Sequence, residues 1–252
     1  LWSPDGTKIA WLSMARDGYE ADKTRLMTAD FADGKISNIR DLTADFKYNA
    51  AGPVWTADSK SIYFNALAEG LQGIFRVNAD GSITRITKEN AWYDYDSPFA
   101  IVQNGEETQL LASWCSMDFP TELVKVAVAD GKSEQITHEN EHILSQLAEH
   151  KTEARMVKTV DGKDMLTWVL YPPQFDSTKT YPGIVICLGG PQGTLSQSWS
   201  YRWNYRLMSA QGYVVALPNR RGTTAFGQEW CEQISGDYSG LNLQDYLSAA
   251  NE

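Results

Sequence analysis

The segment between residues 183 and 227 limits the possible folds more than any other part of the sequence. It holds two short apolar runs, Gly183–Leu188 and Tyr213–Leu217, which are rich in β-branched residues and bounded by Gly and Pro. Such runs are typical of strands in a parallel sheet that is buried on both faces. Helical spacing over Tyr201–Gln211, with Gly212 placed to end the helix, connects them. The segment therefore predicts a right-handed strand–helix–strand crossover.

The loop Gly189-Gly190-Pro191 follows the first predicted strand, at the end where open α/β sheets bind ligands. It lacks the Lys-Ser/Thr of a P-loop, and Pro191 stands where a dinucleotide fingerprint has its second glycine. Two residues without Cβ atoms let backbone N–H groups approach a substrate oxygen closely. We therefore interpret the loop as an oxyanion hole. A Gly-Pro turn that serves only the chain path is the alternative.

The first half of the sequence is repetitive. The stretch Trp2–Trp11 returns as Trp55–Phe64, and an Ala-Asp-Gly turn occurs at 32–34, 79–81 and 129–131. Each turn is followed by a predicted strand that ends in an apolar residue and a threonine, namely Thr43, Thr87 and Thr137. Units of about 40–50 residues with about four strands are typical of β-propeller blades. Since propellers have about 4–8 blades, we expect about three blades here and the others outside this chain. An irregular β-sandwich is the alternative.

The run His138-Glu139-Asn140-Glu141-His142 matches the H-E-x-x-H zinc motif. However, Ile136–Asn140 repeats Ile86–Asn90, where a lysine occupies the first histidine position, and no third ligand is evident downstream. We therefore predict no metal site, and interpret residues 143–153 as a solvated, helical connector. The three cysteines, Cys115, Cys187 and Cys231, have no metal-ligand spacing and are expected to be buried free thiols.

The last hundred residues have the element order of an α/β-hydrolase domain. Strands over Ala154–Val160 and Met165–Tyr171 flank an Asp-Gly turn, and a helical piece covers Gln228–Ile234. A final helix is expected over Asn242–Asn251. Its predicted apolar face consists of Leu243, Tyr246, Leu247 and Ala250.

The sequence contains no G-x-S-x-G nucleophile elbow. The nearest stretch, Gly236–Gly240, has its serine at the wrong position, and the three histidines, His138, His142 and His150, precede the hydrolase-like part. We therefore expect the catalytic Ser, Asp and His to lie beyond Glu252, and this chain to be inactive on its own.

Four motifs together, G-G-P, P-N-x-R-G, G-D-Y-x-G and x-x-Q-D, resemble the prolyl oligopeptidase family of serine peptidases. The resemblance is to the branch of acylaminoacyl peptidases and bacterial dipeptidyl peptidases. It implies partial β-propeller blades over residues 1–142 (the C-terminal three or so), a connector over 143–153 and the N-terminal part of an α/β-hydrolase domain over 154–252.

The resemblance also implies roles for individual residues. The Gly190 N–H would be an oxyanion donor, with Gly189 as a second candidate, and Leu188 stands where family members often carry His or Tyr. Arg220 or Arg221 would hold a substrate carbonyl or carboxylate, unless they form structural salt bridges. The substrate pocket would be walled by Trp199, Tyr201 and Trp203, for which packing under the propeller is the alternative.

The implied function is a serine exopeptidase, of dipeptidyl or acylaminoacyl type, that cleaves short peptides without a metal or organic cofactor. An esterase or lipase on the same scaffold, or a propeller-based binding protein with a degenerate hydrolase domain, are the alternatives, and a homodimer stays open. The net charge of −10, without basic stretches among aromatics, argues against nucleic acid.

No apolar run reaches the ~18 residues of a membrane span, and no signal peptide is visible. Because the chain begins at Leu1, without Met and within a repeat, we expect that the natural N-terminus is missing. The compartment stays open between cytoplasm and periplasm, and the bacterial members of the family favour the periplasm.

Overall fold

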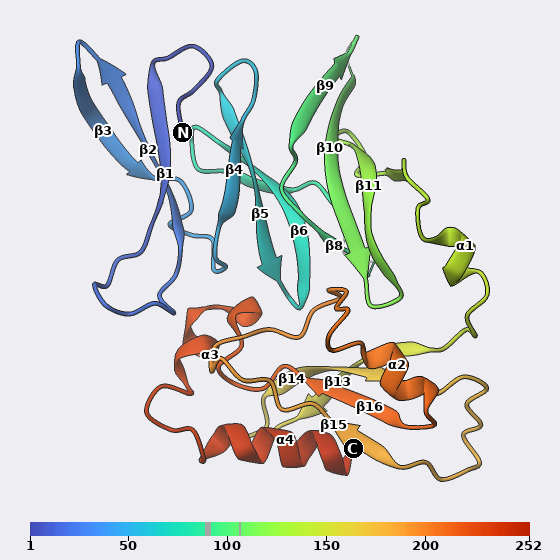
Figure 1. Ribbon diagram of the computed structural model, residues 1–252. Helices are drawn as coiled ribbons and strands as arrows, with labels where there is room; N and C mark the ends of the chain where they lie inside the picture. Colours follow the sequence, from blue (N-terminus) through green and yellow to red (C-terminus); the bar gives the residue numbers. More distant parts are fainter. Residues whose placement is uncertain (89–91, 106) are drawn as a thin grey trace.

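The computed structural model describes residues 1–88, 92–105 and 107–252. Three antiparallel sheets lie side by side in residues 1–135, here called the β half (Figure 1). Beneath them, residues 152–252 form a mixed sheet with helices, here called the mixed half (Figure 1). The segment between the halves carries the one-turn helix α1 (Glu141–Leu144), none of whose residues is buried. Residues 143 and 144 of this helix fall within the expected connector over 143–153, which stays a prediction.

The strands of the β half follow the chain order closely. The first sheet has the order β1-β2-β3, and the second β4-β5-β6-β7. The third has the path β12-β11-β10-β8, with β9 also paired to β10. The bounds are β1 Lys8–Ser13, β2 Arg25–Ala32, β3 Lys35–Asp41, β4 Ala51–Trp55, β5 Ser61–Ala68, β6 Leu71–Asn78, β7 Ile83–Arg85, β8 Asp94–Tyr95, β9 Ala100–Asn104, β10 Glu107–Ser116, β11 Phe119–Ala127 and β12 Ser133–Gln135.

The repeated turns form the hairpins that their sequence predicts. At the first turn Asp33 has φ 50° and Gly34 φ 72°, and this left-handed conformation suits a two-residue hairpin loop. The threonine that closes each repeat has one shared role: its hydroxyl accepts a backbone N–H from a neighbouring strand. The three bonds are Leu26 N to Thr43 Oγ1 (2.9 Å), Ile74 N to Thr87 Oγ1 (3.1 Å) and Leu123 N to Thr137 Oγ1 (2.9 Å). The repeat is therefore structural as well as sequential.

Alternating side chains of β5 join the three sheets into a series. Ile62 and Phe64 pack with residues of the first sheet, such as Leu26, while Tyr63 packs with Leu110 and others of the third. Successive side chains of a strand point to opposite faces, so the middle sheet contributes to both cores. The stretch Ile86–Asn90 noted above extends into residues 89 and 90, which lie outside the described residues.

The mixed sheet confirms the predicted hairpin and the parallel pair. Its order is β13-β14-β16-β15, and only β15 and β16 are parallel. The bounds are β13 Thr152–Lys158, β14 Asp164–Leu170, β15 Gly183–Val185, β16 Val214–Pro218, α2 Tyr205–Ala210, the 3₁₀ turn η1 Thr224–Phe226, α3 Gln228–Glu232 and α4 Leu241–Asn251. Among the described residues, no helix is long and apolar enough to cross a membrane.

Several local expectations need correction. Strand β15 is at the sheet edge with Gly183 exposed, so it is not buried on both faces. Helix α2 starts at Tyr205 rather than Tyr201, because the Asn204 side chain accepts the Leu207 N–H and caps it there. Cys187 is exposed, and of the three thiols only that of Cys231 is fully buried.

Helix α4 turns the opposite way from its predicted apolar face. Leu243 and Leu247 are 46% and 48% exposed, whereas Asp245 is completely buried. The reason is an ion pair between Asp245 and Arg221, which draws the polar side of the helix inward.

Candidate active site at the end of strand β15

The predicted oxyanion loop lies at the carboxyl end of the parallel pair β15 and β16. Gly189 and Gly190 are both exposed, and in the described part of the chain neither backbone N–H donates a hydrogen bond. Gly190 has φ 137°, and a Cβ there would lie 3.1 Å from Gln192 N. Only glycine therefore fits this bend without strain. The loop presents two amide groups that are free to meet a ligand oxygen.

The loop is held from behind by the two residues that follow β16. Asn219 makes a reciprocal pair with Leu195, since its Oδ1 accepts the Leu195 N–H and its Nδ2 donates to the Leu195 carbonyl, both at 2.9 Å. Arg220 Nη2 donates to the carbonyls of Leu188 and Pro191 at 2.9 and 2.8 Å. Because parallel strands end at the same edge of a sheet, the residues after β16 reach the loop after β15.

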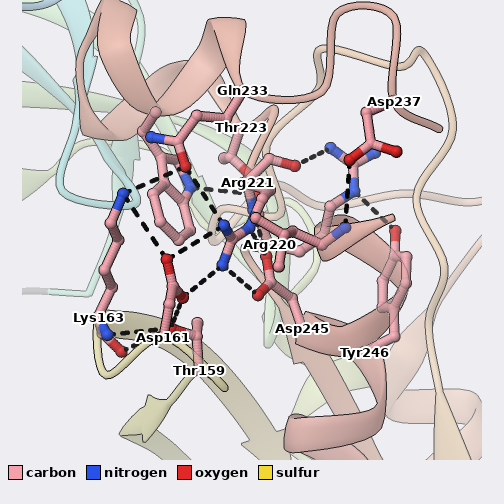
Figure 2. A network of polar contacts seen from close by, with 12 residues as sticks. Thr159, Asp161, Lys163, Arg220, Arg221, Thr223, Gln233, Asp237, Asp245 and Tyr246 are labelled. Carbon is pink, nitrogen blue, oxygen red and sulfur yellow. Dashed lines mark hydrogen bonds and ion pairs between the residues drawn. The ribbon is translucent and has the colours of Figure 1, made fainter. Parts of the chain in front are cut away.

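Arg220 is buried, with 3% exposure, and its guanidinium is surrounded by protein acceptors. Its Nε donates to the Tyr246 hydroxyl of α4 at 3.0 Å, and Nη1 donates to the Arg221 carbonyl at 2.9 Å (Figure 2). Among the described residues, no carboxylate forms an ion pair with it. The predicted substrate contact through Arg220 would have to compete with these bonds.

Arg221, 1% exposed, forms the structural ion pairs that were the alternative for this position. Asp245 accepts its Nε and Nη2 at 2.8 and 2.9 Å, and Asp161 accepts Nη2 at 2.8 Å (Figure 2). The hydrogen bond from Arg221 holds the pKa of Asp161 well below its usual value. Since both carboxylates face the same guanidinium, the network joins α4 to the turn after β13.

Two of the three aromatics predicted to wall the substrate pocket lie beside the connector. The rings of Trp199 and Tyr201 meet edge to face, with centroids 5.7 Å apart. Both line a cavity of about 290 Å³ beside the connector, together with His150 and residues of α2. Trp203 is 57% exposed. In the described residues, no hydrogen bond or ring contact joins these aromatics to the two glycines.

The zinc-like motif has no metal-site geometry in the described residues, where no group of three or more His, Cys, Asp or Glu side chains converges. His138 Nδ1 instead lies 3.3 Å from Glu141 Oε2, and both side chains are exposed.

Sequence reasoning missed two residues around the loop, Asn219 and Tyr246. Asn219 belongs to the P-N-x-R-G motif, which is the signal that points to it. The helical spacing places Tyr246 on the predicted apolar face of α4, but its hydroxyl donates to the Leu188 carbonyl at 3.2 Å. No local pattern distinguishes such a tyrosine from one that only packs.

A buried carboxylate between the halves was also missed. Asp94 of β8 accepts the Gln72 N–H at 2.8 Å and the Ser196 hydroxyl at 2.5 Å. Burial raises its pKa to about 6, although the hydrogen bonds that it accepts oppose this shift. Ser196 follows Leu195, the residue that Asn219 binds. Asp94 therefore links the segment after the glycine loop to the β half.

The fold defined by three antiparallel sheets and a mixed sheet is shared with peptidase structures. A solved acylaminoacyl peptidase in complex with Z-Gly-Gly-Phe-chloromethyl ketone matches with a TM-score of 0.77 at 20% identity, over 98% of this chain and 36% of that one. Porphyromonas gingivalis dipeptidyl peptidase 4 matches with a TM-score of 0.64 at 17% identity, over 95% of this chain and 34% of that one.

Sequence comparison is more specific. Residues 199–252 match the Prolyl oligopeptidase family. Dipeptidyl-peptidase 5 of Porphyromonas gingivalis is 46% identical over 100% of this chain and 35% of its own length. Dipeptidyl-peptidase 5 of Trichophyton equinum is 31% identical over 98% of this chain and 34% of its own length. The chain is thus similar to members of the prolyl oligopeptidase family, and it spans about a third of the length of the curated relatives it matches.

Proposed function

We propose that the whole protein is a serine-type exopeptidase, of dipeptidyl or acylaminoacyl type, that cleaves short peptides through an acyl-enzyme. The observation that carries this proposal is the pair of exposed, unpaired amides at Gly189 and Gly190. Attack on a peptide carbonyl places negative charge on its oxygen, and preorganised backbone N–H groups stabilise that charge. A loop that Arg220 anchors, with free donors at the ligand-binding edge of a sheet, meets this requirement.

These 252 residues would supply one side of the active site. They contain no G-x-S-x-G, so the nucleophile and its Asp and His partners belong to the part of the relatives' length that this chain does not span. The second oxyanion donor would be the N–H that follows that serine. With Leu188 before the glycines, the oxyanion site relies on backbone donors.

The architecture that we propose follows from the same comparison. The three antiparallel sheets would be blades of a β-propeller within residues 1–142, residues 143–153 the connector, and residues 154–252 part of an α/β-hydrolase domain. The shared role of the repeated threonines and the match to acylaminoacyl peptidase support this assignment. The propeller would limit substrate length by its size, and the cavity beside Trp199 and Tyr201 is retained as a candidate substrate contact.

The test compares the whole protein with the 252-residue chain. We expect the whole protein to react covalently with a fluorophosphonate probe and to release dipeptides or acylated amino acids from chromogenic peptide substrates. The 252-residue chain should not react. Hydrolysis of simple esters without peptide hydrolysis would indicate an esterase, and a whole protein that is unreactive in every assay would indicate a binding protein.

A further inference from the structure

Arg220, which lies behind the glycine loop, donates hydrogen bonds to the main chain on both sides of the two glycines. One nitrogen, Nη2 of Arg220, donates to the Leu188 carbonyl at 2.9 Å and to the Pro191 carbonyl at 2.8 Å. The segment between these anchors is the pair Gly189 and Gly190, the least restrained residues that a loop can contain. Without the two anchors, the glycine amides would sample many directions.

The bond to Leu188 also determines where an amide points. The Leu188 carbonyl and the Gly189 N–H belong to one trans peptide group, so they point in opposite directions. Arg220 and the Tyr246 hydroxyl, at 3.2 Å, both donate to this carbonyl from inside the protein. The Gly189 N–H is therefore directed away from them. A charged donor on the carbonyl also polarises the peptide group and makes its N–H a stronger donor.

The charge of Arg220 is used differently from that of its neighbour. Arg221 is neutralised by Asp161 and Asp245, whereas no carboxylate of the described residues forms an ion pair with Arg220. A buried guanidinium without a carboxylate partner is costly unless its N–H groups are satisfied. Here those groups are bound to three carbonyls and to Tyr246, whose ring also lies 5.8 Å from the guanidinium carbon.

We propose that Arg220 is a positioning residue that fixes the oxyanion loop, with Tyr246 as its support. It acts through the Leu188 and Pro191 carbonyls and does not touch the substrate. This inference rests on the proposed peptidase function. The positioning role replaces the substrate contact that the sequence suggested for Arg220.

The experiment uses the whole protein with Arg220→Lys, Arg220→Gln and Tyr246→Phe. Activity per site is obtained by titrating the active serine with a fluorophosphonate, so misfolded molecules are not counted. We expect kcat to fall at least about tenfold in Arg220→Gln with little change in KM, since loss of one oxyanion donor costs about 10²–10³ in kcat. The kcat of Arg220→Lys should be higher than that of Arg220→Gln. The kcat of Tyr246→Phe should lie between those of Arg220→Lys and the wild type.

A second measurement separates loop positioning from general stability. The affinity for a peptide aldehyde, which forms a tetrahedral adduct, should fall by the same factor as kcat, while product affinity stays constant. Arg40→Gln removes an exposed guanidinium on β3, and Tyr213→Phe removes the hydroxyl of an exposed tyrosine before β16, at the end of this strand opposite the loop; neither change should alter these values.

Two failures can be told apart. A wild-type protein that is inactive on peptides would overturn the proposed function, and this role with it. An active wild type whose Arg220→Gln variant keeps kcat and aldehyde affinity per titrated site would overturn the role of Arg220 alone.

Discussion

At the scale of single residues, the two consecutive arginines show how burial and partners separate similar side chains. Arg221 is paired with carboxylates, and Arg220 with main-chain oxygens. Both follow the same strand and neither is more than 3% exposed. The sequence indicated that this position was important, because both belong to the P-N-x-R-G motif. It did not reveal the partners, since Asp245, Asp161 and Leu188 lie far from them along the chain.

Asp245→Asn should destabilise the protein strongly. The change leaves the buried Arg221 guanidinium with Asp161 as its only carboxylate partner among the described residues, and removing one partner of a buried ion pair costs about 3–5 kcal/mol. Urea unfolding of the variant measures this loss. Asp161→Asn is the matched control, because Asp161 is one-third exposed, and should cost roughly 2 kcal/mol. Equal losses in the two variants would contradict this ranking.

At the scale of elements, the sequence predicted those turns and helix ends that depend only on neighbouring residues. The Asp-Gly turns formed hairpins because their φ angles suit these residues, and Gly212, with φ 92°, follows the end of α2 as expected. The face of α4 was wrong because a distant ion pair overrides its apolar pattern. The edge position of β15 was not predicted, since it depends on strand order rather than on the strand's own composition.

Helix α2 offers a test of such a local signal. Asn204→Ala removes the side-chain oxygen that accepts the Leu207 N–H at 2.9 Å, and should lower the free energy of unfolding by about 1 kcal/mol. Asn204→Ser keeps a capping oxygen and should lose much less. Thermal or urea unfolding of both variants measures the difference. If alanine and serine are equivalent, the cap does not set the start of this helix.

At the scale of the whole molecule, we expect Asp94 to make the contact between the halves sensitive to pH. Its pKa is raised by burial from 3.8 to about 6. Between these values the folded state binds a proton more readily than the unfolded chain, so the contribution of Asp94 to stability falls as pH rises. With 1.36 kcal/mol for each unit, the change is on the order of 3 kcal/mol.

Asp94→Asn should therefore remove one component of the pH dependence. We expect the difference in unfolding free energy between wild type and variant to shift in favour of the variant as pH rises from about 4 to 7. Urea titrations at several pH values measure it, and Asp17→Asn, which changes an exposed carboxylate in the loop between β1 and β2, is the control. A difference that stays constant over this range would show that Asp94 does not take up a proton there.

Arg220 binds the loop through carbonyl oxygens and not through side chains. Every residue type presents the same oxygen to it, so the clamp does not depend on the identity of the side chain at position 188. A histidine or tyrosine could be gained or lost there without moving the glycines that follow. Evolution can then tune the chemistry of the pocket while leaving its scaffold in place.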